Sequence, residues 1–171
     1  TRDYNARFTP EKIFFSKDKS MIALDFPGAR RPSIERVAGL TFRANFLTGE
    51  NRLQATIPTA LAYRGIYPGI DAIWRGTGRT LKSEFIVAPH ANAMALRMRY
   101  SGARKVSLSP AGALQVVTAA GTLEESAPIL YQVGMSGRRM SVSGAFRLSP
   151  NGTVRFDIGP YDRALPLYID P

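Results

Sequence analysis

Residues 63–89 read YRGIYPGIDAIWRGTGRTLKSEFIVAP, and this stretch decides how we interpret the rest of the chain. Apolar and polar side chains alternate along 70–75 and again along 81–86, and the glycine-rich run Gly76-Thr77-Gly78 separates the two segments. A period of two is typical of half-buried β-strands, because successive side chains point to opposite faces. The stretch therefore predicts a β-hairpin that turns at the glycines and packs Trp74 into a core.

The corner that precedes this hairpin is Pro68-Gly69. Proline presets φ at the second position of a type II turn and glycine accepts a positive φ at the third, so we expect that turn here. Asp71 follows the corner, and we expect its carboxylate to accept hydrogen bonds from nearby backbone N–H groups. On the second arm, Glu84 is expected to face Lys82 or Arg75 across the strands.

The remainder of the chain also reads as short strands. Runs of apolar and β-branched residues alternate with turn clusters such as Ser109-Pro110-Ala111-Gly112 and Ser149-Pro150-Asn151-Gly152. Turn signals at this spacing are typical of antiparallel sheets. Residues 93–100 contain good helix formers, but their period of two favours a strand. We therefore predict an all-β fold with an antiparallel, β-sandwich-like architecture, and Pro58 indicates an edge position for the strand around 53–59.

Two segments resemble each other without a gap, IALDFPGARRPSI at 22–34 and LRMRYSGARKVSL at 96–108. Both alternate in character and both place an aromatic residue two positions before Gly-Ala-Arg. A duplicated β-unit and the ordinary likeness of glycine-turned hairpins are alternative explanations. The predicted organisation is an N-terminal β half, 1–60, and a C-terminal β half, 61–171, or one continuous domain.

Composition narrows the functional classes. The 171 residues include no cysteine, so neither a disulfide nor a thiolate is available. No apolar run approaches the roughly 18 to 20 residues of a membrane-spanning helix, so we expect no membrane span. The chain starts at Thr1 without a leader, and we interpret it as a mature or excised fragment.

The net charge of +10 would attract acidic polysaccharide or nucleic acid. The basic residues are scattered, mostly as pairs beside turns, where they also serve as solvated ends that block edge pairing. No signature of a sequence-specific nucleic-acid-binding fold is visible, so we expect no specific nucleic-acid partner. The candidate contacts with an acidic polymer are Arg30 and Arg31, Arg104 and Lys105, and Arg138 and Arg139.

Residues suited to catalysis are sparse. His90 is the only histidine, and no G-x-S-x-G elbow accompanies it. One histidine without cysteine cannot supply a zinc site, and no calcium-binding or phosphate-binding loop motif is present. Asp71 and Glu84 are the best candidate pair for glycosidase-like hydrolysis, but a single tryptophan argues against a long aromatic cleft. We therefore predict no catalytic residue, no cofactor and no metal.

A family resemblance is carried by motifs along residues 58–171. The YPGID corner, a hairpin, the run EFIVAP ending at Pro89, and the closing PLYIDP ending at Pro171 follow in order. They resemble the domain of unknown function that stands N-terminal to SBBP-type β-propeller repeats in large bacterial secreted or cell-surface proteins. Residues 1–57 match loosely, His90 stands where glycine is usual, and Trp74-Arg75 replaces what is often a tyrosine pair.

The resemblance implies an extracellular or cell-surface setting and a scaffolding or adhesion role, and the family has no established catalytic residues to carry over. We expect a non-catalytic interaction module that packs against a β-propeller or a like subunit through edge strands, with residues 1–15 as the expected donor or acceptor strand. The alternative is a basic binding module for acidic polysaccharide or nucleic acid. The residues of the structural motif are Tyr67, Pro68, Gly69, Ile70, Asp71, Pro89, Asp170 and Pro171.

Overall fold

The computed structural model describes residues 5–48, 51–77 and 80–171. Antiparallel β-strands make up about 60% of the chain, no α-helix occurs among the described residues, and the all-β prediction is confirmed. The strands are β1 (Asn5–Phe8), β2 (Lys12–Lys17), β3 (Ser20–Asp25), β4 (Ser33–Thr48), β5 (Asn51–Tyr67), β6 (Ile70–Thr77), β7 (Thr80–Val87), β8 (Arg99–Ser101), β9 (Lys105–Leu108), β10 (Leu114–Thr118), β11 (Gly121–Glu125), β12 (Ile129–Val133), β13 (Arg139–Val142), β14 (Gly144–Leu148), β15 (Val154–Ile158) and β16 (Leu167–Asp170).

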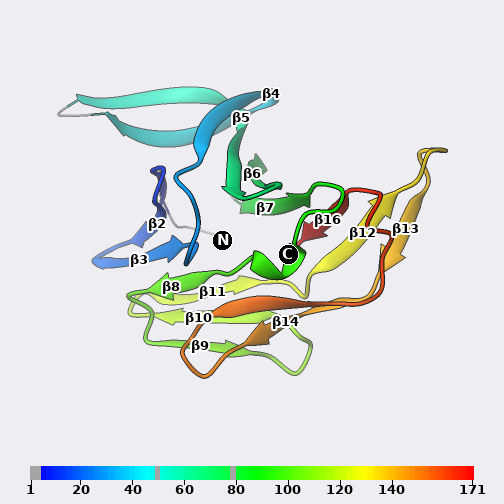
Figure 1. The fold of residues 1–171 in the computed structure, drawn as a ribbon. Helices are drawn as coiled ribbons and strands as arrows, with labels where there is room; N and C mark the ends of the chain where they lie inside the picture. Colours follow the sequence, from blue (N-terminus) through cyan, green and yellow to red (C-terminus); the bar gives the residue numbers. More distant parts are fainter. Residues whose placement is uncertain (1–4, 49–50, 78–79) are drawn as a thin grey trace.

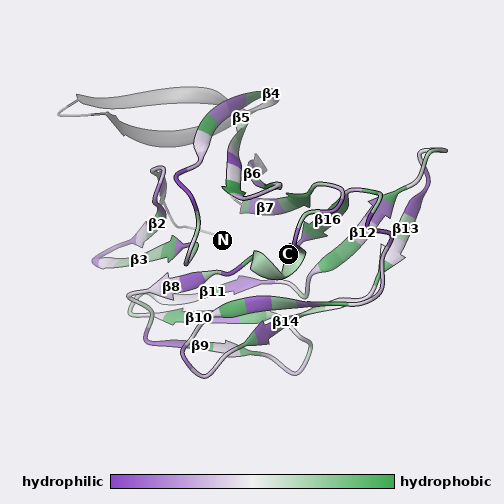
Figure 2. Ribbon diagram, viewed as in Figure 1, coloured by the Kyte–Doolittle hydropathy of each residue, from purple (hydrophilic) through white to green (hydrophobic). Residues whose placement is uncertain are grey.

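The strands form four sheets. The largest has the order β13-β12-β16-β7-β6-β5-β4, and the smaller ones are β1-β2-β3-β8, β11-β10-β9 and the pair β14-β15. Figure 1 shows β7, β16 and β12 in one layer, with the strands from β8 to β11 and β14 beneath it. Hydrophobic and hydrophilic residues alternate along these strands (Figure 2), as expected for sheets with one buried face.

A core of buried side chains joins all four sheets. Phe85 on β7 is fully buried, and its ring lies 6.1 Å from that of Phe26 and 5.9 Å from that of Phe156, both in edge contact. Phe26 follows β3, and Phe156 lies on β15. Residue 60, the predicted boundary between two halves, falls inside β5.

The hairpin of 63–89 is formed by β6 and β7. Trp74 is 4% exposed, which confirms its predicted place in the core, and Gly69 at the preceding corner has φ +71°, as a type II turn requires. The turn predicted at Gly76-Thr77-Gly78 is wrong for its first two residues, because Gly76 pairs with Leu81 and Thr77 with Thr80 inside the ladder. Gly78, the third residue of that predicted turn, lies outside the described residues.

The strand predicted for 93–100 is wrong over its first part. Residues Ala93–Ala95 form a 3-10 helix, and only Arg99–Ser101 form a strand. The side chain of Asn92 accepts a hydrogen bond of 3.1 Å from the backbone N–H of Met94. This cap starts a helical turn, so the good helix formers prevail locally over the alternating pattern.

The two similar segments, 22–34 and 96–108, pair with each other over their first strands. Strands β3 and β8 pair antiparallel, and Asp25 is opposite Arg99, the residue that the alignment makes its equivalent. Gly28 and Gly102, also equivalent, have φ of +78° and +85°. The later parts of the segments diverge, because β4 belongs to the seven-stranded sheet and β9 to the three-stranded sheet, so the pairing leaves both explanations of the likeness open.

The β4–β5 hairpin extends beyond its sheet (Figure 1). Strand β6 pairs with β5 only between Ala60 and Tyr67, whereas β4 follows β5 as far as the Thr48–Asn51 pair. Pro58 therefore lies where β5 has only β4 beside it, as its edge position predicted. Within the described chain, nothing helical has the length and hydropathy that crossing a membrane would require.

Candidate functional site

The YPGID corner is a folding device. Strand β5 is irregular between Tyr63 and Tyr67, where Gly65 has φ +67°. Asp71 accepts hydrogen bonds of 2.8 Å from the backbone N–H of Gly65 and from Nη1 of Arg64, which confirms the predicted contact with the backbone. The carboxylate thus holds the irregular segment in place.

Both carboxylate oxygens of Glu84 also accept hydrogen bonds. Its Oε2 accepts from Nη1 of Arg75 at 2.7 Å, the predicted cross-strand contact, and its Oε1 accepts from the hydroxyl of Tyr131 at 2.8 Å. Burial, followed by the hydrogen bond to Glu84, raises the pKa of Tyr131 to about 12. Because Asp71 and Glu84 each have an arginine of their own, their described contacts are those of structural carboxylates.

His90 connects its loop to Arg163 through hydrogen bonds of its own backbone. The backbone N–H of His90 donates to the carbonyl of Arg163 at 2.8 Å, and Nη2 of Arg163 donates to the carbonyl of His90 at 3.0 Å. His90 has φ +60°, a conformation that glycine adopts without strain, which gives a physical reason for a usual glycine at this position.

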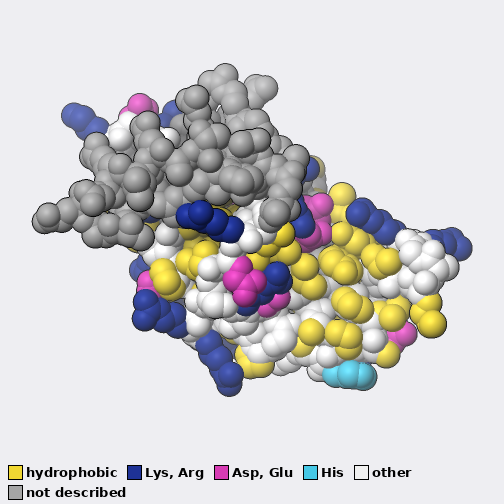
Figure 3. All heavy atoms as spheres, turned by 90° about the horizontal axis from the view of Figure 1, so that it is seen from above, with side chains coloured by type: hydrophobic (Ala, Val, Ile, Leu, Met, Phe, Trp, Pro, Cys, Tyr) yellow, Lys and Arg dark blue, Asp and Glu magenta, His cyan; other side chains and the backbone are white. Residues whose placement is uncertain are grey.

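The six candidate basic residues are all exposed, but they lie in three separate places, each at a turn or at the first residue of the strand that follows it. The turn that leads into β9 and the turn between β12 and β13 are at opposite ends of the fold (Figure 1). Lys and Arg side chains are spread over the face in Figure 3, at its outline and near its centre. Two members of this set also make local contacts, since Nε of Arg31 lies 3.3 Å from Oε1 of Glu11 and the guanidinium of Arg139 lies 4.3 Å above the ring of Tyr131.

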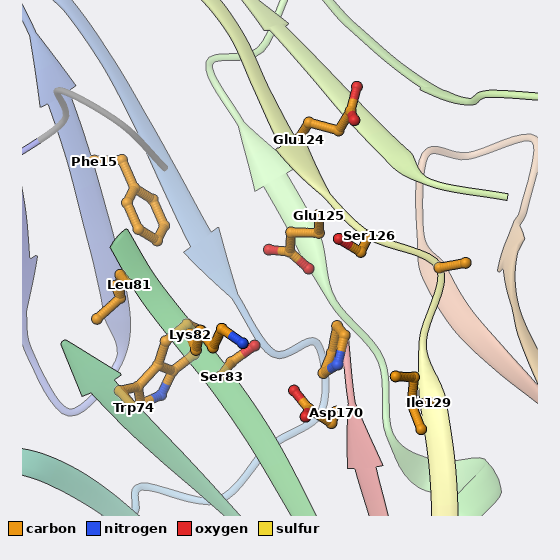
Figure 4. Close-up of a pocket in the computed structure, with 12 residues that line it drawn as sticks. Phe15, Trp74, Leu81, Lys82, Ser83, Glu124, Glu125, Ser126, Ile129 and Asp170 are labelled. Atoms are coloured by element: carbon orange, nitrogen blue, oxygen red, sulfur yellow. The ribbon is translucent and has the colours of Figure 1, made fainter. Parts of the chain in front are cut away.

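A pocket of about 270 Å³ lies where the ends of β6, β7 and β16 meet the segment between β11 and β12 (Figure 4). Trp74 and its register partner Ser83 form part of the wall, and Asp170 and Pro171 of the closing motif form another part. Its lining residues are Phe15, Trp74, Leu81, Lys82, Ser83, Glu124, Glu125, Ser126, Ala127, Ile129, Asp170 and Pro171. Sequence reasoning missed this site, because no motif links residues so far apart.

Glu125 is the most unusual group of the pocket. One carboxyl oxygen, Oε1, accepts a short hydrogen bond from the hydroxyl of Tyr100 on β8. The other, Oε2, is inaccessible and has no hydrogen-bond partner. Burial raises the pKa of this carboxyl, and the bond from Tyr100 opposes that rise. A second buried atom without a hydrogen-bond partner is Nε1 of Trp74.

The outer edge of the seven-stranded sheet is a different kind of site. Strand β13 pairs only with β12 among the described residues. The turn between them carries Met135, which is fully exposed, and Met140 on β13 is 40% exposed. Ile129, at the start of β12, is 65% exposed.

A family model described as a domain of unknown function, DUF7948, matches residues 3–171. The chain belongs to that family, and the match includes the N-terminal residues that the motifs covered only loosely. No curated protein and no solved structure matches the chain.

Proposed function

We propose that this member of the DUF7948 family is a non-catalytic interaction module that associates through β13, one of the two edge strands of its seven-stranded sheet. The observation that supports this proposal is β13, an edge strand flanked by exposed hydrophobic side chains. An edge strand offers a row of backbone donors and acceptors to an incoming strand, and exposed apolar groups beside it add contact area.

The backbone groups available on β13 follow from its register. Gly134 N–H donates to the carbonyl of Arg138 at 3.0 Å, and β12 and β13 continue from there in an unbroken antiparallel register. Hydrogen-bonded and non-hydrogen-bonded pairs alternate along such a ladder. The N–H and C=O groups of Arg139 and Ser141 therefore face away from β12, toward a partner strand.

Arginine on an edge usually discourages strand addition, because its charge repels or screens an incoming chain. Here the guanidinium of Arg139 is placed over the face of Tyr131, at 4.3 Å from the ring centre. Tyr131 in turn stacks on Tyr168, with ring centres 4.9 Å apart and planes 6° from parallel. The arginine charge thus lies on the sheet face and leaves the backbone edge open.

The N-terminal segment is less suited to this role than its sequence suggested. Strand β2 is paired on both sides, by β1 and by β3. Phe8, Ile13 and Phe15 are buried in the core, so donating this segment to another chain would open the core. We therefore assign the interaction to β13.

The setting that we propose is an exported bacterial protein with an extracellular or cell-surface location, in which β13 meets a neighbouring β-propeller or a second copy of this chain. Support for this setting comes from the YPGID and closing PLYIDP motifs. The coding sequence on either side of this segment tests it directly: SBBP-type repeats downstream and an export signal upstream are expected, and a gene that lacks both contradicts the setting.

The edge itself is tested with Ser141→Pro. Proline removes the outward N–H and cannot join a new ladder, while an edge position tolerates it because no bond to β12 is lost. Sedimentation equilibrium up to millimolar concentration is expected to show a dimer for the unaltered chain and for Ser141→Ala, and a monomer for Ser141→Pro. Circular dichroism and a urea midpoint establish that each variant is folded.

Amide hydrogen exchange provides the second measurement, because it reports occupation of the edge by any partner. The amides of Arg139 and Ser141 are expected to exchange more slowly in the full-length protein or in the dimer than in the unaltered chain at a concentration low enough for it to be monomeric. A chain that is monomeric at millimolar concentration, and whose β13 amides exchange at one rate in every context, would refute the proposal.

A further inference from the structure

The pocket beside Trp74 is an acidic hollow in a strongly basic protein. Three carboxyl groups line it, those of Glu124, Glu125 and Asp170, against the single ammonium group of Lys82. The chain as a whole carries a net charge of +10. A local reversal of sign at a concave site favours ligands of the opposite charge to those that the rest of the surface attracts.

We propose that this pocket binds the side chain of a basic residue, lysine or arginine, presented by a peptide. The volume of about 270 Å³ suits one side chain and its peptide group. Carboxylates would pair with the cationic head, and such charge-assisted hydrogen bonds are the stronger ones.

The apolar part of the wall suits the stem of such a side chain. Phe15 and Trp74 are buried side chains whose surfaces reach the pocket, and Ile129 stands exposed at its rim. The methylene groups of lysine and arginine pack along apolar surface while the charged head stays polar. An aromatic ring beside the cation adds attraction from its π-face.

Two buried atoms give independent support, because both lack hydrogen-bond partners. Nε1 of Trp74 can only donate, and Oε2 of Glu125 can accept. Leaving a buried polar group unpaired costs about 1 to 3 kcal/mol, so each such atom in a folded protein calls for an explanation. In the proposed complex the cation of a basic peptide residue would supply the missing partner of Oε2 of Glu125, once the side chains that cover this atom move aside.

Figure 4 shows the carboxyl group of Glu125 within the pocket, between Phe15 on one side and Ser83 and Asp170 on the other. Tyr100 holds its far oxygen from β8, which fixes the direction of the group. Both unpartnered atoms are covered in this structure. Lys82 is exposed at the same wall, and its flexible side chain can move aside for a ligand.

The single tryptophan of the chain reports binding directly, because it forms the pocket wall. We would titrate the folded chain with N-acetyl-arginine amide and N-acetyl-lysine amide, and with the norleucine and glutamate analogues as controls, and follow tryptophan fluorescence. Only the two cationic probes are expected to give a saturable change. Their ratio distinguishes guanidinium from ammonium recognition.

Three variants locate the response. Asp170→Asn and Glu125→Gln are each expected to weaken binding of the cationic probes about tenfold, the size of one charge-assisted hydrogen bond. Lys82→Met, which removes the competing cation, is expected to strengthen it. The matched control is Asp157→Asn, because Asp157 is an exposed carboxylate that pairs with Arg147 and does not line the pocket.

The proposal is overturned by a fluorescence response that the norleucine or glutamate probe reproduces, by the absence of a saturable change, or by equal affinities in all four variants. Urea midpoints near that of the unaltered chain show that a loss of binding is not a loss of fold. The site does not depend on the sheet edge, so Ser141→Pro is expected to bind the cationic probes as tightly as the unaltered chain.

Discussion

Gly144 marks the point where the chain leaves the large sheet for the β14–β15 pair, and its substitution provides a quantitative test of the packing there. A Cβ atom at this position would lie 2.5 and 2.6 Å from the two methyl carbons of Leu130 and 3.0 Å from its Cγ. Leu130 is 2% exposed, so the leucine has little room to move. The φ of Gly144 is outside the left-handed region, so Gly144→Ala tests packing without backbone strain.

The expected magnitude follows from the overlap. Carbon atoms at optimal contact are roughly 3.5 to 4.0 Å apart, so the added methyl group is about 1 Å too close to two atoms. Overpacking of this kind costs about 1 to 3 kcal/mol, and the gain from replacing glycine in a strand returns about 0.5 to 1 kcal/mol. We expect Gly144→Ala to lower the free energy of unfolding by about 1 to 2 kcal/mol.

Leu130→Ala alone should cost about 2 to 5 kcal/mol, because it leaves a cavity. In the double variant, the methyl group introduced by Gly144→Ala occupies part of that space, so the combined loss should fall short of the sum by about 1 to 2 kcal/mol. Urea unfolding measures each free energy. Gly134→Ala is the matched control, since its nearest neighbour would be an ordinary 3.6 Å from the new Cβ. Strict additivity would refute the contact.

Three further predictions concern single sites or surfaces. Burial raises the pKa of Glu125, so the folded chain binds more protons than the unfolded one between the ordinary and the raised pKa, and stability falls as pH rises through that window. Glu125→Gln should therefore raise the melting temperature at pH 7 and lose this advantage below about pH 4, as calorimetry across pH would show; a gain that is equal at both pH values contradicts the assignment. His90→Gly should raise the free energy of unfolding by up to about 1 kcal/mol, because φ +60° suits glycine, and an unchanged or lower urea midpoint would argue against strain there. Retention on heparin at low salt should fall when all six basic turn residues become glutamine, and no retention of the unaltered chain would remove the acidic-polymer alternative; the six are Arg30, Arg31, Arg104, Lys105, Arg138 and Arg139.

The features that were predicted correctly from the sequence are those that depend on residues close together along the chain. The type II corner, the hairpin, the burial of Trp74 and the contact of Asp71 with a backbone N–H all arise within a few residues of Pro68. The alternation of apolar and polar residues predicted a strand at 93–95, and this prediction was wrong. The side chain of Asn92 caps a 3-10 helix there instead. The prediction that the β6–β7 turn begins at Gly76 was also wrong. Glycine occurs within strands as well as at their ends, so its presence alone does not locate a turn.

The pocket could not be predicted, because its parts come from distant segments. Tens of residues separate its lining side chains along the chain, as in the set Phe15, Trp74, Glu125 and Asp170. These residues belong to three different sheets, and the packing of the sheets brings them together. In the sequence, Glu124-Glu125 reads as a solvated end of a strand. Only the hydroxyl of Tyr100, contributed by another sheet, shows that one of these two carboxyl groups is held in the interior.

The YPGID corner and the candidate ligand site therefore occupy different residues, whereas the closing PLYIDP motif contributes Asp170 and Pro171 to the pocket wall. Tyr63, Tyr67 and Asp71 each have a folding role, with their polar groups bound to the carbonyls of Thr9 and Pro27 and to the N–H of Gly65. A motif whose polar atoms are all satisfied internally has none left to bind a ligand. Among the buried side-chain atoms without partners, those of Trp74 and Glu125 belong to residues that line the pocket, so the YPGID pattern reflects a constraint on folding and the pocket is the candidate ligand site.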